Sequence, residues 1–459
     1  MQQDAQKAVR PIKIGVTDVD GVLRAKYLSS NKIAGKQEPG IGFCNVIFGW
    51  DIHDRLYEGY APDHGFADAE LFIDTSTKRS IPWEDHIQFY LADFGAGDDF
   101  AAQLCPRGLL KRLIKKAESM DLESRFGPEY EWFLYRESPS SVAEKNYNDF
   151  TSLSPGMFGY SDLRTSQNSA YHHDLFEQLS AFDVELEGLH TETGPGVLEA
   201  AIEHRPALEA ADRAILFKQG VKSISYRHGL MSSFMAKPSA ELPGCGGHLH
   251  QSLWRDGKNI FYDAHGRYGL SKLGEHYLAG LLDMSSAIAL FFAPNVNSYK
   301  RYVPGSWAPT RYNWGIDNRT VAYRVIPGGS KGTRIEARLP GADANPYLAI
   351  SACLAAGLYG IENELPLDVA PIQGSAYDGG LMNENTDRSA TAPNPSDEKT
   401  SLIPSDLAQA IGLASADMRL PKLFGQAFVD HFLETRRQEW RQYQVAVTDW
   451  ERRRYFELA

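Results

Sequence analysis

Two glutamates interrupt an apolar stretch of the chain, FGPEYEWFLY, at residues 126–135. In a β-strand, residues two apart point to the same face, so Glu129 and Glu131 would share a face with their Cα atoms roughly 7 Å apart. Like charges on one face of an apolar strand repel each other and resist the loss of hydration. Any fold that contains this strand has to supply something for these two side chains to face.

Pairs of polar side chains two residues apart recur along the chain. HLHQSLW carries two histidines, RIEAR a glutamate and an arginine, and ETGPGVLE a glutamate on each side of a Gly-Pro-Gly turn. These side chains are Glu192, Glu199, His248, His250, Glu336 and Arg338. Carboxylates are hard oxygen ligands for Mg²⁺ or Mn²⁺, and imidazole is compatible with Mn²⁺. The pattern therefore indicates a site for two divalent ions, completed by substrate and water.

Each pattern also has a simpler interpretation. A single Glu-x-Glu on a strand is usually a solvated face, and a single His-x-His is more often structural or exposed than a metal ligand. The apolar flanks of Glu129 and the repetition of the pattern favour a metal site. Spacing alone leaves both interpretations open.

Basic side chains gather in three segments, NSYKRYVP, DNRTVAYRV and KGTRIEAR. They supply Arg301, Arg319, Arg324, Lys331, Arg334 and Arg338. Guanidinium groups bind carboxylates and phosphates through two hydrogen bonds, and phosphoryl transfer needs metal ions and such groups to neutralise charge. For any single arginine, surface ion pairing is the alternative. The chain has no GxxxxGK[ST] motif, so an ATP site here would not be a P-loop.

Composition narrows the class of protein. A net charge of -12 over 459 residues argues against a nucleic-acid binder. The four cysteines form no CxxC pair and are too few for a disulfide framework, which favours a reducing compartment. The N-terminus lacks an apolar signal core, and the longest apolar runs are too short or too interrupted to span a bilayer. We therefore expect a soluble, cytoplasmic protein that binds neither nucleic acid nor membrane.

The pattern of predicted elements changes near residue 105. Before it, short β-rich runs alternate with turn formers: IKIGVTDVDG, FCNVIFGWDI, AELFIDT and HIQFYLADF. A helical pattern then begins with CPRGLLKRLIKKAESM, where Pro106 occupies a first-turn position. We expect a small sheet domain over residues 1–105 and a larger domain of strands and helices over residues 106–459.

Capping residues mark several helices of the larger domain. One long helix is predicted over residues 206–228, with Pro206 early and Gly229 as its stop. Asn345 is predicted to cap the next, and Ser405 a later one. Residues 364–404 are rich in turn formers and are predicted to be a long surface loop, and a charged helix through ETRRQEWRQYQ is predicted near the end of the chain.

Taken in order, these segments resemble the glutamine synthetase family over nearly the whole chain. The motifs are FGPEYEWFLY, ETGPGVLE, GGHLHQSLW, NSYKRYVPG, DNRT, RIEARLPGADANPYLA and VTDWERRRYFE. The resemblance implies an α+β fold: a β-grasp domain over 1–105, and a catalytic domain over 106–459 whose curved antiparallel sheet forms a partial barrel flanked by helices. It also implies a homo-oligomer, a dodecamer of two stacked hexameric rings with active sites between neighbouring subunits.

The resemblance assigns a role to each candidate residue. One Mg²⁺ or Mn²⁺ would be held by Glu131, Glu192 and Glu199, and a second by Glu129, His248 and Glu336. ATP would contact Glu187, His250, Ser252, Arg319, Arg324, Lys331 and Arg334, with Arg319 and Arg324 as phosphate clamps. L-Glutamate would contact Gly244, Arg301 and Arg338. Arg319, Glu336 and Arg338 would act at the reacting groups.

The implied reaction has two steps. The side-chain carboxylate of glutamate attacks the γ-phosphorus of ATP and forms γ-glutamyl phosphate, and an amine then displaces phosphate to form a γ-glutamyl amide. The acyl phosphate has to be kept from water, so we expect loops that close over the site.

Two positions depart from the family pattern. The flap of the ammonia-using enzymes reads PGYEAP, but this chain reads PGSWAP, which puts Trp307 in place of a glutamate. The family motif FDGSS supplies an aspartate for ammonium, but the nearest match here is FGWDI, where Gly49 falls at that position and Trp50 and Asp51 follow. Tryptophan accepts no proton and forms no ion pair, although its face attracts cations.

These departures predict an amine pocket formed by Trp50, Asp51 and Trp307 that suits an amine with apolar substituents. The chain would then resemble the γ-glutamylpolyamine and γ-glutamylalkylamide synthetases. The alternatives are ordinary glutamine synthesis with ammonium, a non-catalytic structural member of the family, and a metal-dependent hydrolase that uses the same carboxylates.

Overall fold

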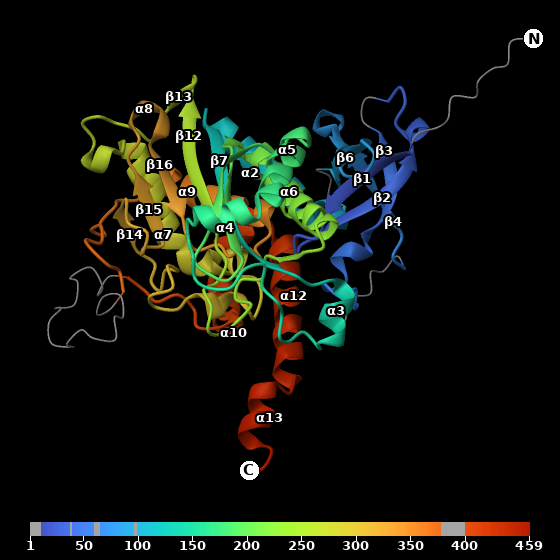
Figure 1. The fold of residues 1–459 in the computed structure, drawn as a ribbon. Coiled ribbons are helices and arrows are strands. Elements are labelled where there is room, and N and C mark those ends of the chain that lie inside the picture. The colour runs from blue at the N-terminus through green and yellow to red at the C-terminus, as the bar shows by residue number, and fades with distance from the viewer. Residues whose placement is uncertain (1–10, 37–38, 59–64, 96–98, 378–399) are drawn as a thin grey trace, which may run out of the picture.

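The computed structural model describes residues 11–36, 39–58, 65–95, 99–377 and 400–459. Two sheets organise these residues (Figure 1). The N-terminal sheet has the strand order β2-β1-β6-β4-β3, with β5 beside β6, and its one parallel pair is β1 with β6. Its strands are β1 (Pro11–Thr17), β2 (Leu23–Ser29), β3 (Gly40–Cys44), β4 (Asp68–Ile73), β5 (Arg79–Ile81) and β6 (Ile87–Asp93).

The second sheet is larger and almost entirely antiparallel. Its order is β14-β15-β16-β12-β7-β9-β8, with β10 and β11 beside β7 and β13 beside β12. The strands are β7 (Glu123–Tyr135), β8 (Leu186–Thr191), β9 (Val197–Ile202), β10 (Arg205–Pro206), β11 (Met231–Ser233), β12 (Gly247–Arg255), β13 (Lys258–Asn259), β14 (Trp314–Ile316), β15 (Tyr323–Ile326) and β16 (Arg334–Ala337). This curled sheet with flanking helices confirms the predicted α+β fold.

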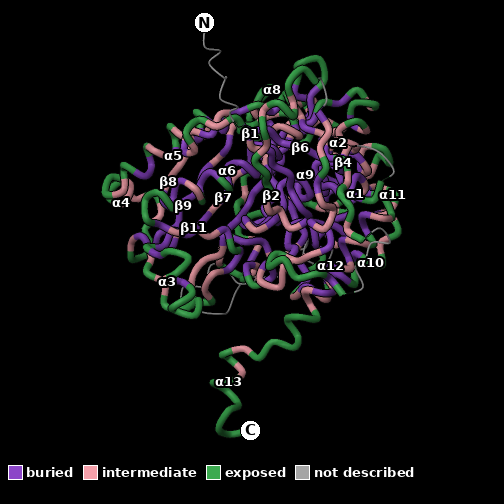
Figure 2. The backbone as a smooth tube through the Cα atoms, turned by 90° about the vertical axis from the view of Figure 1, so that its right-hand side faces the viewer, coloured by how far each residue is buried: buried purple, intermediate pink, exposed green. Residues whose placement is uncertain are grey.

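Helices cover the large sheet and extend beyond it. They are α1 (Phe100–Leu104), α2 (Pro106–Ser119), α3 (Pro139–Glu144), α4 (Asp162–Gln167), α5 (Ser169–Ala181), α6 (Ala207–Arg227), α7 (Lys272–Phe292), α8 (Gly329–Gly332), α9 (Pro346–Glu362), α10 (Leu407–Ala416), α11 (Leu420–Phe424), α12 (Gln426–Val445) and α13 (Asp449–Tyr455). In Figures 1 and 2 the last helix projects away from the rest of the chain and is mostly exposed. No helix among the described residues combines the length and apolar character that crossing a bilayer needs.

Most predicted helix boundaries are confirmed. Pro106 stands at the start of α2, and α6 runs from Ala207 to Arg227 before Gly229, which has a positive φ of 67°. The Asn345 side chain accepts a hydrogen bond from the backbone N–H of Tyr347 at the start of α9, as a cap does.

Two local predictions were wrong. FCNVIFGWDI is not extended throughout, because β3 ends at Cys44, opposite Asp68, where β4 begins. The chain then forms a 3₁₀ helix at Asn45–Phe48 that buries Phe48 against Phe94.

The second wrong prediction concerns the N-terminal cap of α10. The cap is Asp406 and not Ser405, because the Asp406 carboxylate accepts from the N–H of Gln409, at 2.9 Å. The Ser405 hydroxyl contacts side chains instead. Of the predicted loop 364–404, residues 378–399 lie outside the described residues.

A buried arginine joins the two sheets. Arg107 of α2 donates to Asp93 of β6, at 2.7 Å, and twice to Asp212 of α6, at 2.9 Å. The Tyr347 hydroxyl donates to the same Asp212, at 2.6 Å. A fork that binds two buried carboxylates from different elements fixes their relative position. The division at residue 105 lies beside this junction and stays a prediction.

The Arg107 network should dominate the stability of this junction. Arg107→Met would leave buried Asp212 without its cation and buried Asp93 with Lys111 alone, which costs about 3–5 kcal/mol. The matched control is Lys116→Met on the same helix, which removes only an exposed ion pair with Glu362 and should cost less than about 1 kcal/mol. Urea unfolding midpoints measure both, and equal losses in the two variants would contradict the role given to Arg107.

Candidate active site

The strand that carries the two glutamates is the centre of the candidate site. In β7, Glu129 and Glu131 share one face, and Tyr130 and Trp132 share the other. Tyr130 and Trp132 are buried, and both rings pack against Phe217 of α6. The aromatic face thus anchors the strand in the core, while the glutamates face away from it.

Neighbouring strands bring further acids and imidazoles to the same face. The facing pairs are His248 with Glu129, Glu199 with Glu131, and His250 with Glu336. Residues directly opposite each other in antiparallel strands point to the same side of the sheet. Glu129 and Glu131 therefore share their face of the sheet with acid and imidazole side chains from the neighbouring strands.

The side chains approach each other closely. His250 Nε2 lies 3.1 Å from a carboxylate oxygen of Glu129. His248 Nδ1 lies 3.6 Å from Glu336 Oε1 and 3.9 Å from Glu129 Oε2. These contacts join β7, β12 and β16 through their acids and imidazoles.

Potential metal ligands form three overlapping groups among the described residues. Within each, the ligand atoms lie within 4.8 Å of one another. The groups are Glu129 with His250 and Glu336, Glu131 with Glu199 and His248, and His190 with Glu192 and Glu199. The structure thus brings all six predicted ligands into one cluster. It groups them differently from the two predicted trios, and the division between two ions stays a prediction.

The charges in this cluster are strongly coupled. Burial, together with the negative charge of Glu129, raises the pKa of Glu199 to about 11. Burial also opposes ionisation of Glu129, but hydrogen bonds from His248 and His250 hold its pKa well below the usual range. Burial likewise opposes ionisation of Glu336, yet the neighbouring charge of Arg338 lowers its pKa to about 2. Glu199 therefore keeps a proton at neutral pH while its neighbours are ionised.

This donor set fits hard divalent cations. Carboxylate oxygens predominate, imidazole nitrogens complete the groups, and no thiol is among the ligand atoms. The like-charge repulsion that raises the Glu199 pKa is the kind that a nearby cation removes. Mg²⁺ or Mn²⁺ matches these ligands, as the sequence predicted.

Sequence reasoning missed His190. Its Nε2 lies 3.2 Å from Glu192 and 3.5 Å from Glu199, and its ring stacks on Tyr160 with centroids 4.3 Å apart. The signal was present, because His190 and Glu192 show the same two-residue spacing as the other pairs. His190 belongs to the candidate metal site.

A cavity of about 400 Å³ adjoins the cluster and collects every residue predicted to contact ATP. Those lining residues are Glu187, His250, Ser252, Arg319, Arg324, Lys331 and Arg334. Glu129 lines it as well, so the cavity opens directly onto the acids. Segments distant in sequence meet here, since the lining comes from β7, β8, β9, β12, β15, α8, β16 and the loop between β14 and β15.

The arginines of this cavity differ in what they contact. Arg324 donates to Glu336, at 3.0 Å, and to Asp317, and Arg334 donates to His250 Nδ1, at 3.1 Å. Arg319 makes no hydrogen bond to any other residue in the described part of the chain. Its guanidinium keeps all its donors for an anionic ligand, as a phosphate clamp requires.

The residues predicted to bind glutamate lie together on the other side of the cluster. Arg301 and Arg338 are both buried, and Arg301 donates to the backbone carbonyl of Arg338, at 3.1 Å. A Cβ on Gly244 would lie 2.8 Å from the Arg301 side chain, so only glycine lets that arginine pass. Arg338 donates to Glu336, and its Nε has no partner among the described residues. A buried guanidinium with a free donor suits a substrate carboxylate.

Of the three predicted amine-pocket residues, the structure brings only Trp307 to this site. Its backbone carbonyl accepts from Arg338, at 3.3 Å, and its side chain is 47 % exposed. Trp50 stacks with Arg24, and Asp51 accepts from the backbone of His53. Those two belong to the N-terminal sheet region, and their contacts within the chain are with other residues than the cluster.

The comparisons with known proteins agree with this geometry. The family described as "Glutamine synthetase, catalytic domain" matches residues 103–455. This chain belongs to the glutamine synthetase family. Type-1 glutamine synthetase 2 of Dictyostelium discoideum is 46% identical over 97% of this chain and 84% of its own length.

Two other glutamine synthetase relatives are informative. Glutamate–isopropylamine ligase of Pseudomonas sp. is 34% identical over 97% of this chain and 95% of its own length. The solved GmaS/ADP complex superposes with a TM-score of 0.81 at 29% identity, covering 98% of this chain and 97% of that one.

Membership of the glutamine synthetase family confirms the predicted family and the predicted ATP-dependent ligase. It therefore disfavours the hydrolase and the non-catalytic alternatives. Enzymes of this family generally use ATP and divalent metal ions, which agrees with the cavity and the acidic cluster. The role of each residue stays a prediction.

Metal binding should release a proton at neutral pH. The Glu199 pKa lies near 11, so this carboxyl is protonated at neutral pH and has to lose its proton to bind a cation. Mn²⁺ titration calorimetry in buffers of different ionisation enthalpy should count about one proton per chain. Glu199→Gln should abolish this release and weaken binding. The same release in that variant would exclude Glu199 as its source.

His190 should strengthen metal binding. His190→Ala removes the imidazole beside Glu192 and Glu199, and loss of such a ligand or supporting partner weakens metal affinity by about 10–100-fold. Mn²⁺ calorimetry measures the change directly, without turnover. His173→Ala on the exposed face of α5 is the control and should bind as the wild type does. Unchanged affinity in His190→Ala would remove this residue from the site.

Proposed function

We propose that this enzyme joins the γ-carboxyl of L-glutamate to an amine larger than ammonia, with an apolar substituent, through γ-glutamyl phosphate. The observation that carries the proposal is Trp307, an indole beside the candidate glutamate site where the ammonia-using relatives have a carboxylate. The family membership supports the ATP-dependent ligation itself.

Local contacts support the placement of the indole. Trp307 has a positive φ of 60°, a strained conformation for a bulky residue, so surrounding contacts have to hold it. Arg338 donates to its carbonyl, and the Tyr377 hydroxyl donates to the next carbonyl, that of Ala308, at 3.1 Å. The Ser306 hydroxyl donates to the Val303 carbonyl, at 2.6 Å. These anchors hold the backbone of Trp307 next to the arginine predicted to bind glutamate, and the residue is about half exposed.

Charge explains why the indole changes the preferred amine. A carboxylate at this position would stabilise ammonium by direct ion pairing, whereas an indole offers a large apolar surface and a weaker cation–π attraction. An alkyl substituent gains contact energy against the indole, about 0.8 kcal/mol for each buried CH₂. Ammonia gains none of this.

The chain's own residues would carry the chemistry. We propose that Glu131, Glu192 and Glu199 hold one divalent ion and Glu129, His248 and Glu336 another; when bound, these ions neutralise charge on the phosphates. Arg319 and Arg324 would hold the transferred phosphoryl group in line with the glutamate carboxylate. Arg301 and Arg338 would hold glutamate itself. The flap that carries Trp307 would shield the acyl phosphate from water until the amine attacks.

The proposed assembly follows from the two residues that lie away from the site. We propose a dodecamer in which Trp50 and Asp51 of a neighbouring copy complete the amine pocket, since within one chain they contact other groups. A mixed assembly of one variant lacking Trp50 and another lacking Arg338 would then recover activity. The predicted cytoplasmic location stays a prediction.

A second candidate is ordinary glutamine synthesis. The Dictyostelium relative that is 46% identical is named as a type-1 glutamine synthetase, and its similarity favours ammonium. The Pseudomonas relative is named for isopropylamine and favours an alkylamine. Only the amine differs between the two candidates, so one measurement separates them.

Amine preference should depend on Trp307. With ATP, L-glutamate and Mg²⁺, phosphate release should show a higher kcat/KM for isopropylamine or a polyamine than for ammonium. Trp307→Glu should move the ratio toward ammonium by about tenfold or more, since one ion pair at a desolvated site is worth roughly 1.4 kcal/mol. Trp307→Phe keeps an aromatic face and should keep the preference. Ammonium as the best substrate of the unaltered enzyme would establish ordinary glutamine synthesis.

A further inference from the structure

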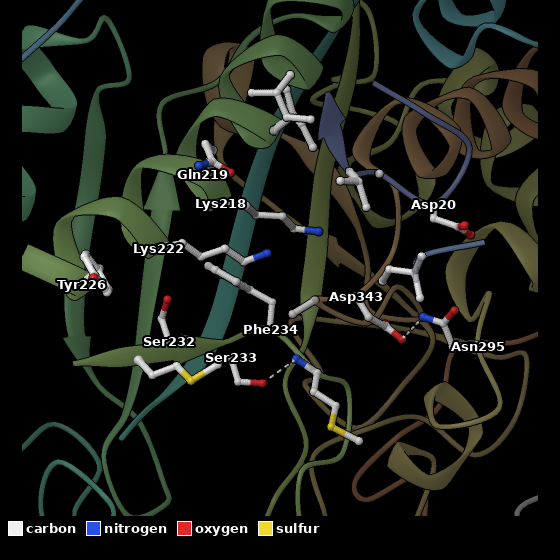
Figure 3. Close-up of a pocket in the computed structure, with 18 of the residues that line it drawn as sticks. Asp20, Lys218, Gln219, Lys222, Tyr226, Ser232, Ser233, Phe234, Asn295 and Asp343 are labelled. Atoms are coloured by element: carbon white, nitrogen blue, oxygen red, sulfur yellow. Dashed lines mark hydrogen bonds between the residues drawn. The ribbon is translucent and has the colours of Figure 1, made fainter. Parts of the chain in front are cut away.

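A second cavity lies apart from the candidate active site. It encloses about 600 Å³ between α6, β11 with the segment after it, and the loop that joins β1 to β2 (Figure 3). Lys218 and Phe234 line it, and the Lys218 ammonium group lies over the ring of Tyr130 of β7. Tyr130 lies between Glu129 and Glu131 in sequence but on the opposite face of β7, so the strand separates this cavity from the metal cluster.

Two lysines one helical turn apart reach this cavity. Lys218 is 8% exposed, and its Nζ donates to the Ala344 carbonyl, at 2.8 Å, and lies 4.9 Å from the centroid of the Tyr130 ring. Lys222 follows four residues later, and its Nζ lies 6.0 Å from the centroid of the Phe234 ring. Figure 3 shows both ammonium groups pointing into the cavity above Phe234.

Neither ammonium group forms an ion pair with a residue that the structure describes. Among the residues that the structure describes, no carboxylate oxygen lies within 4.0 Å of either Nζ. Two cations at this spacing on one helix face repel each other. Burial, reinforced by the charge of Lys222, lowers the pKa of Lys218 to about 7.

The acids that line the cavity are bound elsewhere. Asp20 pairs with Arg436, and Asp343 Oδ2 accepts from Ser298, at 2.5 Å, and Asn295, at 3.1 Å. Asp343 Oδ1 is buried and has no partner in the described part of the chain. Burial raises the pKa of Asp343, and no oxygen of this acid lies within 4.0 Å of either lysine Nζ. The cavity therefore keeps excess positive charge at its inner end.

The remaining wall is largely apolar. Its side chains include Leu23, Ile52, Ile215, Leu230, Met231 and Met235. A small anion that contacts both lysines would leave the apolar wall exposed to water. A hydrocarbon part on the same ligand would cover that wall. A ligand with both features would bury apolar area and pair the charges together.

We propose that this cavity binds a small organic carboxylate, with its carboxylate on Lys218 and Lys222 and its hydrocarbon part against Phe234 and the apolar wall. Such a ligand is neither the nucleotide nor the glutamate of the ligase reaction, because the lining of this cavity includes none of the residues proposed to bind those substrates. The proposal does not depend on which amine the enzyme uses.

Calorimetric titration of the full chain with hexanoate tests the proposal. Hexanoate should bind with ATP and L-glutamate present, and Lys222→Gln should weaken its binding about tenfold or more, as expected for losing a charged hydrogen-bond partner. Lys222 is exposed, so this substitution should leave the unfolding midpoint unchanged. Lys222→Arg, which keeps the charge, should retain binding, and Lys32→Gln outside the cavity is the matched control.

Further arms define what would overturn the proposal. Lys218→Gln should weaken hexanoate binding as Lys222→Gln does, and norleucine, which shares the carboxylate and the hydrocarbon chain, should bind while hexylamine should not. Absence of hexanoate binding, displacement of hexanoate by ATP with L-glutamate, equal binding by both glutamine variants and the wild type, or preference for hexylamine would each overturn it. None of these results bears on the amine preference measured by phosphate release.

Discussion

Repulsion among buried carboxylates is the constraint on which this structure depends. Glu129, Glu131, Glu192, Glu199 and Glu336 meet in one cluster, and burial opposes the ionisation of Glu129, Glu199 and Glu336. The chain compensates with imidazoles on β12 and with the guanidinium of Arg338. This compensation is incomplete, because burial and the remaining negative charge of neighbouring carboxylates still raise the pKa of Glu199. A divalent cation supplies the missing positive charge, so the same imbalance that weakens the empty cluster gives it affinity for metal.

The alternation of β7 separates chemistry from packing. Its glutamates face the cluster, while Tyr130 and Trp132 bury their rings against α6. Because side chains alternate with a period of two, a slip of one residue would exchange the two sets and put carboxylates into the core. The registry with β9 and β12 is therefore strongly specified. On the second face, the Tyr130 ring lies under the Lys218 ammonium group of the proposed carboxylate site.

Buried polar contacts hold the N-terminal sheet against the helices of the larger domain. Arg107 binds carboxylates from both sides of the junction, and the Asn345 side chain, while capping α9, also donates to the backbone carbonyls of Asp18 and Val19. The N-terminal sheet is thus held by buried polar contacts whose partners are expensive to leave unpaired. Trp50 and Asp51 lie between β3 and β4 of that sheet, and their contacts within the chain are not with the acidic cluster. This is why we place them in the site of a neighbouring copy.

Much of the fold and site could be read from the sequence. Strand alternation placed Glu129 with Glu131 and His248 with His250, because backbone geometry dictates which residues share a face. Caps such as Asn345 and stops such as Gly229 are similarly local, and the ordered motifs predicted the family. Local signals failed where two neighbours compete, as at Ser405 and Asp406, or where a strand lost its partner, as after Cys44.

The sequence by itself determined the kinds of ligand atoms, the faces of their strands and the substitution of an indole for a carboxylate at position 307. Tertiary structure alone decided which imidazole lies beside which carboxylate, that His190 joins the cluster, and that Lys218 and Lys222 share a cavity without an ion-pair partner among the described residues. The reason is physical: alternation and capping involve only a few residues along the chain, whereas ion pairing and pKa values depend on distances between atoms that only folding brings together.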